Sequence, residues 1–461
     1  MKNLIPRLSL PEAAGLSLSV TCPTVTAAFN VTLVAQAAGP AAPLAFLIGA
    51  VAIAFIALSF MAFTRRVAHA GSAYAYIGHT FGTRLGFAAG WTLLLTYLGF
   101  GTGFAALVGS FVCAGLKGMG IAWGPLWLVI GALSLLLGWW LAYRDMRLAG
   151  RIMLALEAAA VTGITALCVS ILRQASPGME RTLASFHPAT SFGGWSGIGF
   201  GMVFCVLSFA GFEGAATLGE ETINPRRNIP IALFGTVLAS AVFFVFVSYC
   251  EVIGFGPHGI KALAASDAPL NDLALRYASP RVAIALDLAA ATSCFAGVIG
   301  SVAAAARLLF ALGRAGLSAA LAEVHPVHDT PTVAIGLAAV LTVLPFLAWA
   351  PFTGAGNFYS YTSTIAALAL ILVYIGVGAA EGVEAYREGR PLWPALCMLG
   401  PLLLFWVLYR NIYPVPEFPN NLWPYVAAAW VIASWAIMKL RPAVVRASLP
   451  AYSQAAVRSG S

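Results

Sequence analysis

Residues 15–26 read Gly15-Leu16-Ser17-Leu18-Ser19-Val20-Thr21-Cys22-Pro23-Thr24-Val25-Thr26, an apolar segment with a proline inside it and five hydroxyl side chains around that proline. Proline removes a backbone hydrogen-bond donor and clashes with the preceding helical turn. In a membrane, nearby hydroxyl groups satisfy the carbonyls that such a break leaves open. The segment therefore predicts a membrane helix that is interrupted near its middle.

A second stretch has the same character. Residues 207–214 read Leu207-Ser208-Phe209-Ala210-Gly211-Phe212-Glu213-Gly214, with two glycines and a carboxylate in an apolar run. Taken singly, each break also fits an ordinary kink, because Pro and Gly are frequent in membrane helices. Interrupted segments at matching positions of two halves of a chain, however, indicate a transporter binding site.

The composition of the whole chain requires a membrane. Of its 461 residues, 60% are hydrophobic and 9% are charged, and the mean hydropathy is +0.88. A soluble domain has about 25% charged residues, so this chain lacks the polar side chains needed to cover a water-facing surface. We therefore predict an all-α integral membrane protein, and soluble enzymes, secreted scaffolds and disordered proteins are excluded.

Apolar runs between charged or Pro/Gly-rich breaks predict twelve transmembrane helices. These ranges are 12–37, 43–63, 86–114, 123–142, 150–172, 195–220, 230–253, 280–312, 332–350, 358–380, 393–411 and 422–440. The two interrupted ranges are the first and the sixth. The first ten ranges would then form a 5+5 inverted repeat, with residues 12–172 as one half and residues 195–380 as the other.

The ends of the chain complete this division. Residues 393–440 add two further helices, and residues 1–11 and 441–461 form the N-terminus and a disordered tail. Most of the 25 lysines and arginines fall in the loops of one side of the predicted membrane. By the positive-inside rule this side is cytoplasmic. We therefore expect both termini in the cytoplasm, a location in the cell (inner) membrane and no cleavable signal.

The sequence lacks the motifs that are typical of several other classes of protein. The seven cysteines sit singly in apolar runs, and the six histidines are scattered over both predicted sides. We therefore expect no metal site and no cofactor. No nucleotide-binding loop is present, and the spread of basic residues argues against nucleic acid. A membrane-embedded transferase, which needs a clustered His/Asp or Ser/His constellation, and a channel, which needs a filter or a ring of like charges, are the weaker alternatives.

Five short stretches resemble a known family. They are Glu220-Glu221-Thr222-Ile223-Asn224-Pro225-Arg226-Arg227-Asn228-Ile229-Pro230, similar to EE-x-x-NPRRNIP; Phe209-Ala210-Gly211-Phe212-Glu213, similar to F-x-GF-D; Ala70-Gly71-Ser72-Ala73-Tyr74-Ala75-Tyr76, similar to AGGxYxY; Arg307 to Gly316, similar to R-x-x-x-AxxRDG; and Thr330-Pro331. They run in the order found in the amino acid–polyamine–organocation superfamily. The chain resembles its bacterial amino acid permease branch, which implies the leucine-transporter fold with broken helices 1 and 6.

The resemblance also implies a substrate site between the two breaks. The substrate carboxylate would meet the backbone amides of Thr24, Val25 and Thr26, which follow Thr21 and Pro23. The ammonium group would meet carbonyls near Ser19, Val20, Ser208 and Phe209. Ala210 and Gly211 would leave room for the substrate side chain. The aromatic residues that could line the pocket are Tyr97, Phe358, Tyr359 and Tyr361. Phe209 would be an aromatic gate, and Glu220 and Glu221 would be structural or gating partners at the cytoplasmic end.

Two carboxylates at membrane depth, Glu213 and Glu157, are candidates for ion coupling, because a charge in hydrocarbon is costly and usually functional. Proton-coupled relatives often carry a lysine in the fifth helix, and Glu157 stands at about that position. Three alternatives stay open. Each carboxylate could only hydrogen-bond its neighbours, Glu213 could pair with a cationic substrate, or Thr292 and Ser293 could bind Na⁺ as adjacent hydroxyls do in sodium-coupled relatives.

The predicted function is secondary active transport of amino acids by alternating access, with proton-coupled import as the first hypothesis. Sodium-coupled transport or exchange of a cationic amino acid or polyamine is the alternative. The small residues at the second break favour a neutral or small amino acid. The expected partners are this small-molecule substrate, H⁺ or Na⁺ and the lipid bilayer, without an obligatory protein partner.

Overall fold

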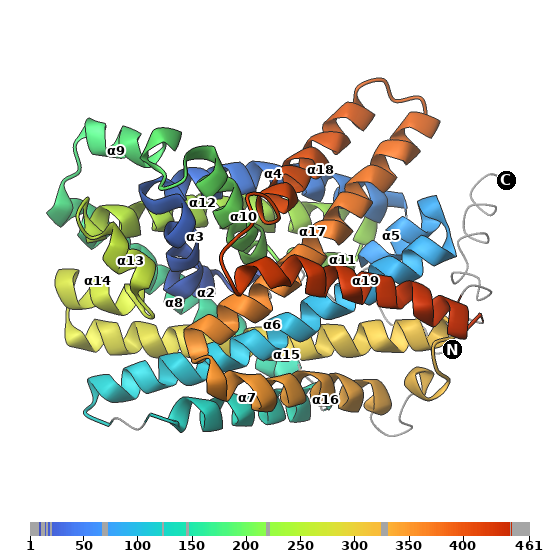
Figure 1. Cartoon of the computed structure of the whole chain (residues 1–461), viewed down its shortest axis with the longest axis horizontal. Helices are drawn as coiled ribbons and strands as arrows, with labels where there is room; N and C mark the ends of the chain where they lie inside the picture. Colours follow the sequence, from blue (N-terminus) through green and yellow to red (C-terminus); the bar gives the residue numbers. More distant parts are fainter. Residues whose placement is uncertain are drawn as a thin grey trace.

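The computed structural model describes residues 9–10, 14, 17–18, 21–66, 72–121, 124–143, 147–217, 222–323, 331–442 and 444. Within these ranges every secondary-structure element longer than one residue is a helix (Figure 1). The predicted all-α class is therefore confirmed.

The long helices follow the predicted apolar runs. They are α3 (Val31–Ala38), α4 (Ala42–Arg66), α6 (Thr83–Gly118), α7 (Leu126–Tyr143), α8 (Arg147–Ala175), α10 (Gly194–Ser208), α12 (Pro225–Phe255), α15 (Pro280–Arg314), α16 (Thr332–Trp349), α17 (Ala355–Arg387), α18 (Trp393–Arg410) and α19 (Trp423–Leu440). The shorter α-helices are α2 (Pro23–Val25), α5 (Ser72–Phe81), α9 (Met179–Ser185), α11 (Gly214–Thr217), α13 (Ile260–Ala265) and α14 (Pro269–Tyr277). One π-helix, Thr26–Asn30, joins α2 to α3.

Among the described residues, ten helical segments are long and apolar enough to cross a membrane. This number is smaller than the twelve predicted ranges for two structural reasons. The first two ranges join into one helical run, Pro23–Arg65, because the short 3₁₀ turn Gly39–Ala41 connects α3 directly to α4. The sixth range is interrupted, so that α10 alone has 15 residues.

Two long helices, α6 and α15, pack along each other through the centre of the bundle (Figure 1). Helix α6 approaches its other neighbours closely because it carries glycines at the contacts. A Cβ atom added to Gly99 would lie 2.9 Å from the backbone oxygen of Thr362 in α17, and one added to Gly109 would lie 2.1 Å from the backbone oxygen of Trp127 in α7. Small residues that let backbones approach in this way are typical of membrane helix packing.

The short helices α9, α13 and α14 lie together at one end of the molecule, on the left in Figure 1. Helix α13 packs against α3, where the side chain of Gln36 donates to the backbone oxygen of Ala264 at 3.0 Å. Helix α14 is fastened to the end of α12, because Arg276 and Tyr277 both donate to the backbone oxygen of Gly254. The short helices at this end therefore pack on α3, which follows the first break, and on the C-terminal end of α12.

Replacing Gly109 with Ala should lower the stability of the protein by about 1–3 kcal/mol, because the new methyl group meets a backbone carbonyl that cannot rotate away. The measurement is thermal unfolding of the detergent-purified protein. Gly235→Ala in α12 is the matched control, since a Cβ atom there meets nothing within 4 Å. Equal unfolding midpoints for both variants would contradict the close contact between α6 and α7.

Candidate functional site

The two interrupted helices meet near the middle of the bundle. The first is broken at Cys22, whose backbone is left-handed (φ 48°, ψ 62°), and helix α2 starts at the next residue, Pro23. The second ends at Ser208 and resumes only at Gly214, after a turn in which Gly211 has a φ of 101°. A φ of this size is strained for any residue with a side chain, so the turn requires glycine.

One side chain joins the two breaks directly. The hydroxyl of Ser17 donates to the backbone oxygen of Phe212 at 2.6 Å, and the hydroxyl of Thr21 donates to the backbone oxygen of Ser17 at 2.9 Å. The hydroxyl groups next to Pro23 therefore satisfy carbonyls of both breaks. Without such partners, each open carbonyl in a membrane would cost several kcal/mol.

The π-helix Thr26–Asn30 follows the first break and places Asn30 between two other helices. The side-chain nitrogen Nδ2 of Asn30 donates to the Ser208 hydroxyl at 2.9 Å, and the Tyr359 hydroxyl donates to Oδ1 of Asn30 at 2.8 Å. The Ser208 hydroxyl donates onward to the backbone oxygen of Phe204. This Asn30 bridge links the π-helix, α10 and α17, and π-helical turns are frequently found at functional sites.

A small cavity of about 30 Å³ lies between the breaks and helices α6, α15 and α17. It is lined by Thr21, Cys22, Val25, Thr26, Asn30, Tyr97, Phe100, Phe104, Leu207, Ser208, Ala210, Gly211, Gly300, Ser301 and Tyr359. Hydroxyl and amide groups come from the breaks, from α15 and α17 and from Tyr97 of α6, whereas Phe100 and Phe104 of α6 form an aromatic wall. None of the described residues that line the cavity has a charged side chain.

Glu157 of α8 is 4% exposed and contacts the first break. Its Oε1 accepts a hydrogen bond of 2.8 Å from the backbone amide of Thr24, and Ser293 of α15 faces the same carboxyl group. The hydroxyls of Thr24 and Ser293 are both buried and face this carboxyl group, to which they can donate. A buried carboxylate and two hydroxyls therefore gather beside the first break.

Glu213 is 2% exposed and holds the second break. Its Oε2 accepts from the hydroxyl of Tyr374 at 2.7 Å and from the backbone amide of Gly211 at 3.0 Å. These two donors stabilise the carboxylate and fix the turn around Gly211. In this conformation Glu213 therefore stabilises the turn around Gly211.

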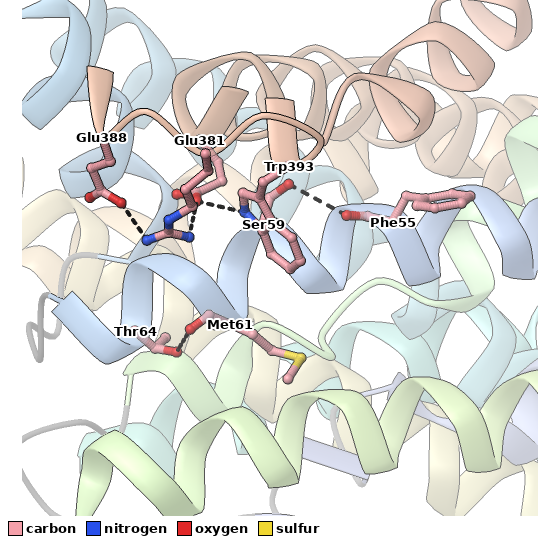
Figure 2. Close-up of polar contacts among 8 residues, drawn as sticks. Phe55, Ser59, Met61, Thr64, Glu381, Glu388 and Trp393 are labelled. Carbon is pink, nitrogen blue, oxygen red and sulfur yellow. Dashed lines mark hydrogen bonds and ion pairs between the residues drawn. The ribbon is translucent and has the colours of Figure 1, made fainter. Parts of the chain in front are cut away.

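A further buried carboxylate, Glu381, lies near the C-terminal end of α17 (Figure 2) and does not line the cavity. It accepts from the indole nitrogen of Trp393 at 3.0 Å and lies 3.9 Å from Arg390, which also pairs with Glu388. Figure 2 shows this cluster beside Ser59 of α4. It fixes the turn between α17 and α18, and sequence reasoning did not identify it.

The structure brings most of the predicted substrate residues together. The predicted residues that line the cavity are Thr21, Val25, Thr26, Tyr97, Ser208, Ala210, Gly211 and Tyr359, and Pro23 and Thr24 are buried next to it. The predictions for Ser19, Val20, Glu220 and Glu221 lie outside the described residues. Each of the three amides expected to meet a carboxylate already has an acceptor: Glu157 for Thr24, Cys22 for Val25 and Pro23 for Thr26.

Two predicted side chains lie differently from what was expected. The ring of Phe209 is fully buried and packs edge-on against Phe244 at a centroid distance of 5.0 Å, so that it does not line the cavity it was expected to gate. Thr292 is on an exposed face of α15 and donates to Ala289, whereas Ser293 is buried. Adjacent residues of a helix point about 100° apart, so these two hydroxyls do not converge on one cation.

Sequence reasoning missed seven of the residues that line the cavity, namely Cys22, Asn30, Phe100, Phe104, Leu207, Gly300 and Ser301. Asn30 had a usable signal, since it is an amide side chain within the apolar stretch Ala27–Val34. The two phenylalanines had no such signal. An apolar residue of a membrane helix looks the same in the sequence whether it faces lipid, a neighbouring helix or a cavity.

Membrane-length apolar helices, two of them broken around a central cavity, define a multi-pass membrane protein of the transporter class. Comparison with known proteins agrees. The model of the family described as amino acid permease matches residues 22–388. The chain belongs to this family. Because the family and its members are permeases, the protein is a transporter and not an enzyme.

The individual relatives are named for different transported substrates. The branched-chain amino acid permease BcaP of Lactococcus lactis subsp. cremoris (strain MG1363) is 28% identical over 405 residues, which are 81% of this chain and 83% of the relative. The low-affinity putrescine importer PlaP of Escherichia coli (strain K12) is 27% identical over 66% of each chain. The methylthioribose transporter of Bacillus subtilis (strain 168) is 24% identical over 85% of this chain and 86% of its own.

Among solved structures, a manganese transporter mutant from Eremococcus coleocola has the same fold. The TM-score is 0.57 at 11% sequence identity, and the match covers 96% of this chain and 98% of that one. At this identity the similarity concerns the fold alone.

Replacing Asn30 with Ala should destabilise the protein by about 1–3 kcal/mol, because it leaves the buried hydroxyl of Tyr359 without its acceptor. Tyr359→Phe should also destabilise, and the double variant should lose less than the sum of the two, as expected for direct partners. Unfolding in detergent measures all three. Tyr361→Phe, two residues along the same helix and half-buried, is the control. Fully additive losses for Asn30 and Tyr359 would rule out the bridge.

Proposed function

We propose that the protein is a secondary active transporter that imports neutral amino acids with apolar side chains by alternating access. The observation that carries this proposal is the uncharged cavity between the two breaks. One side of it offers hydroxyl and amide groups from Thr26, Asn30 and Ser208, and the other side is the aromatic wall of Phe100 and Phe104. A zwitterion with an aliphatic side chain presents matching groups.

The relatives support the same substrate class without deciding it. BcaP is named for branched-chain amino acids and PlaP for putrescine. A dication such as putrescine would need carboxylates, and the nearest ones, Glu157 and Glu213, are already engaged with backbone amides. We therefore favour the neutral substrate, and a cationic amino acid or polyamine paired with Glu213 is the alternative.

The proposal includes the topology expected from the sequence. Twelve helices would cross the cell (inner) membrane, the first ten as a 5+5 inverted repeat of residues 12–172 and 195–380, with both termini in the cytoplasm. Protons are the proposed coupling ion, with Glu157 and Glu213 as the candidate carriers. Sodium is less favoured, because Ser293 alone of the predicted hydroxyl pair faces the first break.

Substrate binding must change the shape of the site. A cavity of about 30 Å³ has room for about one or two water molecules, and an amino acid needs several times that volume. The helix segments around the breaks, or the side chains of the Asn30 bridge, therefore move when substrate enters. We propose that the conformation described is one in which the site is closed.

Thermal unfolding of the detergent-purified protein with L-leucine, L-lysine or putrescine tests the substrate class. A ligand that binds only the folded state adds about 2.7 kcal/mol at a hundredfold excess over Kd. We expect a rise in the midpoint with L-leucine and none with the two cations. A rise with putrescine alone would contradict the neutral substrate and favour a contact with Glu213.

Cys22 provides a test of the site itself, because its side chain lines the cavity. A methanethiosulfonate reagent should modify Cys22 more slowly in the presence of saturating L-leucine, which fills the space around the sulfur. Mass spectrometry of the peptide that contains Cys22 gives the rate. Cys22→Ala removes the leucine-sensitive labelling, and Cys113, half-buried in α6 outside the cavity, is the internal control. Equal rates with and without leucine, when leucine is bound, would move the site elsewhere.

A further inference from the structure

The contact between Glu157 and Thr24 places a carboxylate of the protein where a substrate carboxylate is expected. Oε1 of Glu157 lies 2.8 Å from the amide nitrogen of Thr24, and α8 is thereby joined to the start of α2. The amides of Val25 and Thr26 are engaged by backbone carbonyls within the same turn. Of these three backbone amides, that of Thr24 donates to a side chain rather than to a backbone carbonyl. A carboxylate of a bound ligand can replace a side-chain carboxylate at this amide.

We propose that Glu157 occupies the Thr24 amide in the substrate-free protein, yields it to the carboxylate of the amino acid, and takes up one proton as it does so. This inference rests on the proposed function, because it requires an amino acid in the cavity. It adds the identity of the coupling residue, the stoichiometry of one proton per substrate and the reason why the proton is needed.

The surroundings of Glu157 provide the reason. Among the described elements, α2, α12, α14 and α15 pack against α8. The titratable groups of these elements and their ends that face Glu157 are two thiols, Cys22 beside α2 and Cys294 of α15. The acidic group of α12, Glu251, faces Cys168 instead, about three turns farther along α8. Within the described part of the chain no cationic side chain pairs with Glu157.

A displaced Glu157 would therefore be a buried carboxylate without an N–H donor, next to the carboxylate of the substrate. Both burial and the neighbouring negative charge disfavour the ionised form. A protonated carboxyl group becomes a hydrogen-bond donor, and the buried hydroxyls of Ser293 and Thr24 face it. A hydroxyl group can donate to the carboxylate or accept from the protonated carboxyl group, so the same two side chains would accept the new O–H group.

Glu213 does not have these properties. Its carboxylate accepts from two donors, and one of them, the Tyr374 hydroxyl, belongs to α17 and does not line the cavity. A substrate that displaced Gly211 from Glu213 would still leave this second donor in place. Glu213 would therefore keep a hydrogen-bond donor when substrate binds, and the exchange does not require it to take up a proton.

The exchange has a defined proton balance. The free protein holds Glu157 as a carboxylate, and the complex holds one substrate carboxylate at Thr24 and one neutral Glu157, so that one proton enters from solvent. By linkage, the Kd for the amino acid should fall tenfold for each unit decrease in pH while Glu157 is ionised in the free protein. Apart from the new O–H bond of Glu157, no covalent bond forms or breaks.

Titration calorimetry of the full-length protein with L-leucine, in two buffers with different ionisation enthalpies, measures the proton directly. We expect the wild type to take up close to one proton per leucine. Glu157→Gln should bind leucine with no proton uptake and with a Kd independent of pH, whereas Glu381→Gln, at a buried carboxylate that does not line the cavity, should retain the wild-type proton uptake. Leucine binding by the wild type without proton uptake, or unchanged uptake in Glu157→Gln, would overturn the proposal.

A second ligand keeps the test independent of how well the variant folds. L-Leucinamide lacks the carboxylate that would displace Glu157, so the wild type should bind it without proton uptake or not bind it at all. Leucinamide binding that takes up one proton would overturn the exchange. Failure of the proposed function gives a different result, namely no heat of binding from the wild type with leucine or any other amino acid.

Discussion

A backbone N–H or C=O group in hydrocarbon has no water to bind, and every interruption of a membrane helix must therefore find partners inside the protein. The site of this permease is built from those partners. Ser17 binds the open carbonyl of Phe212, Glu157 binds the amide of Thr24, and Glu213 binds the amide of Gly211. The same interactions that make the two breaks tolerable bring polar groups together at the centre of an apolar bundle.

The breaks could be predicted because Pro and Gly act on their own backbone. Pro23 and Gly211 mark the interruptions in the sequence, and the structure has them at Cys22 and at the turn before Gly214. The helix ranges were predictable for the same kind of reason, since apolar length is a local property. The joining of α3 to α4 through Gly39–Ala41 was not predictable, because Gly-Pro is typical of a loop, whereas here the turn continues the helical run.

The direction in which each side chain points could not be predicted from the sequence. Phe209 packs on Phe244 and Thr292 is on an exposed face, although both are next to residues that lie where they were expected. A direction depends on how a helix is rotated against its neighbours, and this is set by contacts such as those of Gly99 and Gly109 with other helices. The partner of Glu157 was hidden for a related reason, since 133 residues separate it from Thr24.

The π-helix Thr26–Asn30 has a consequence for how this family can vary. A π-turn holds one residue more than the α-helical turn it replaces. Deletion of a single residue between 26 and 30 would remove the wide turn and let the segment return to α-helical winding, while α3 keeps its orientation. The side chains of the turn itself, including the one that faces Ser208 and Tyr359, would be redistributed. Gain or loss of one residue here would change the chemistry of the site in one step, without any substitution among the residues that line it.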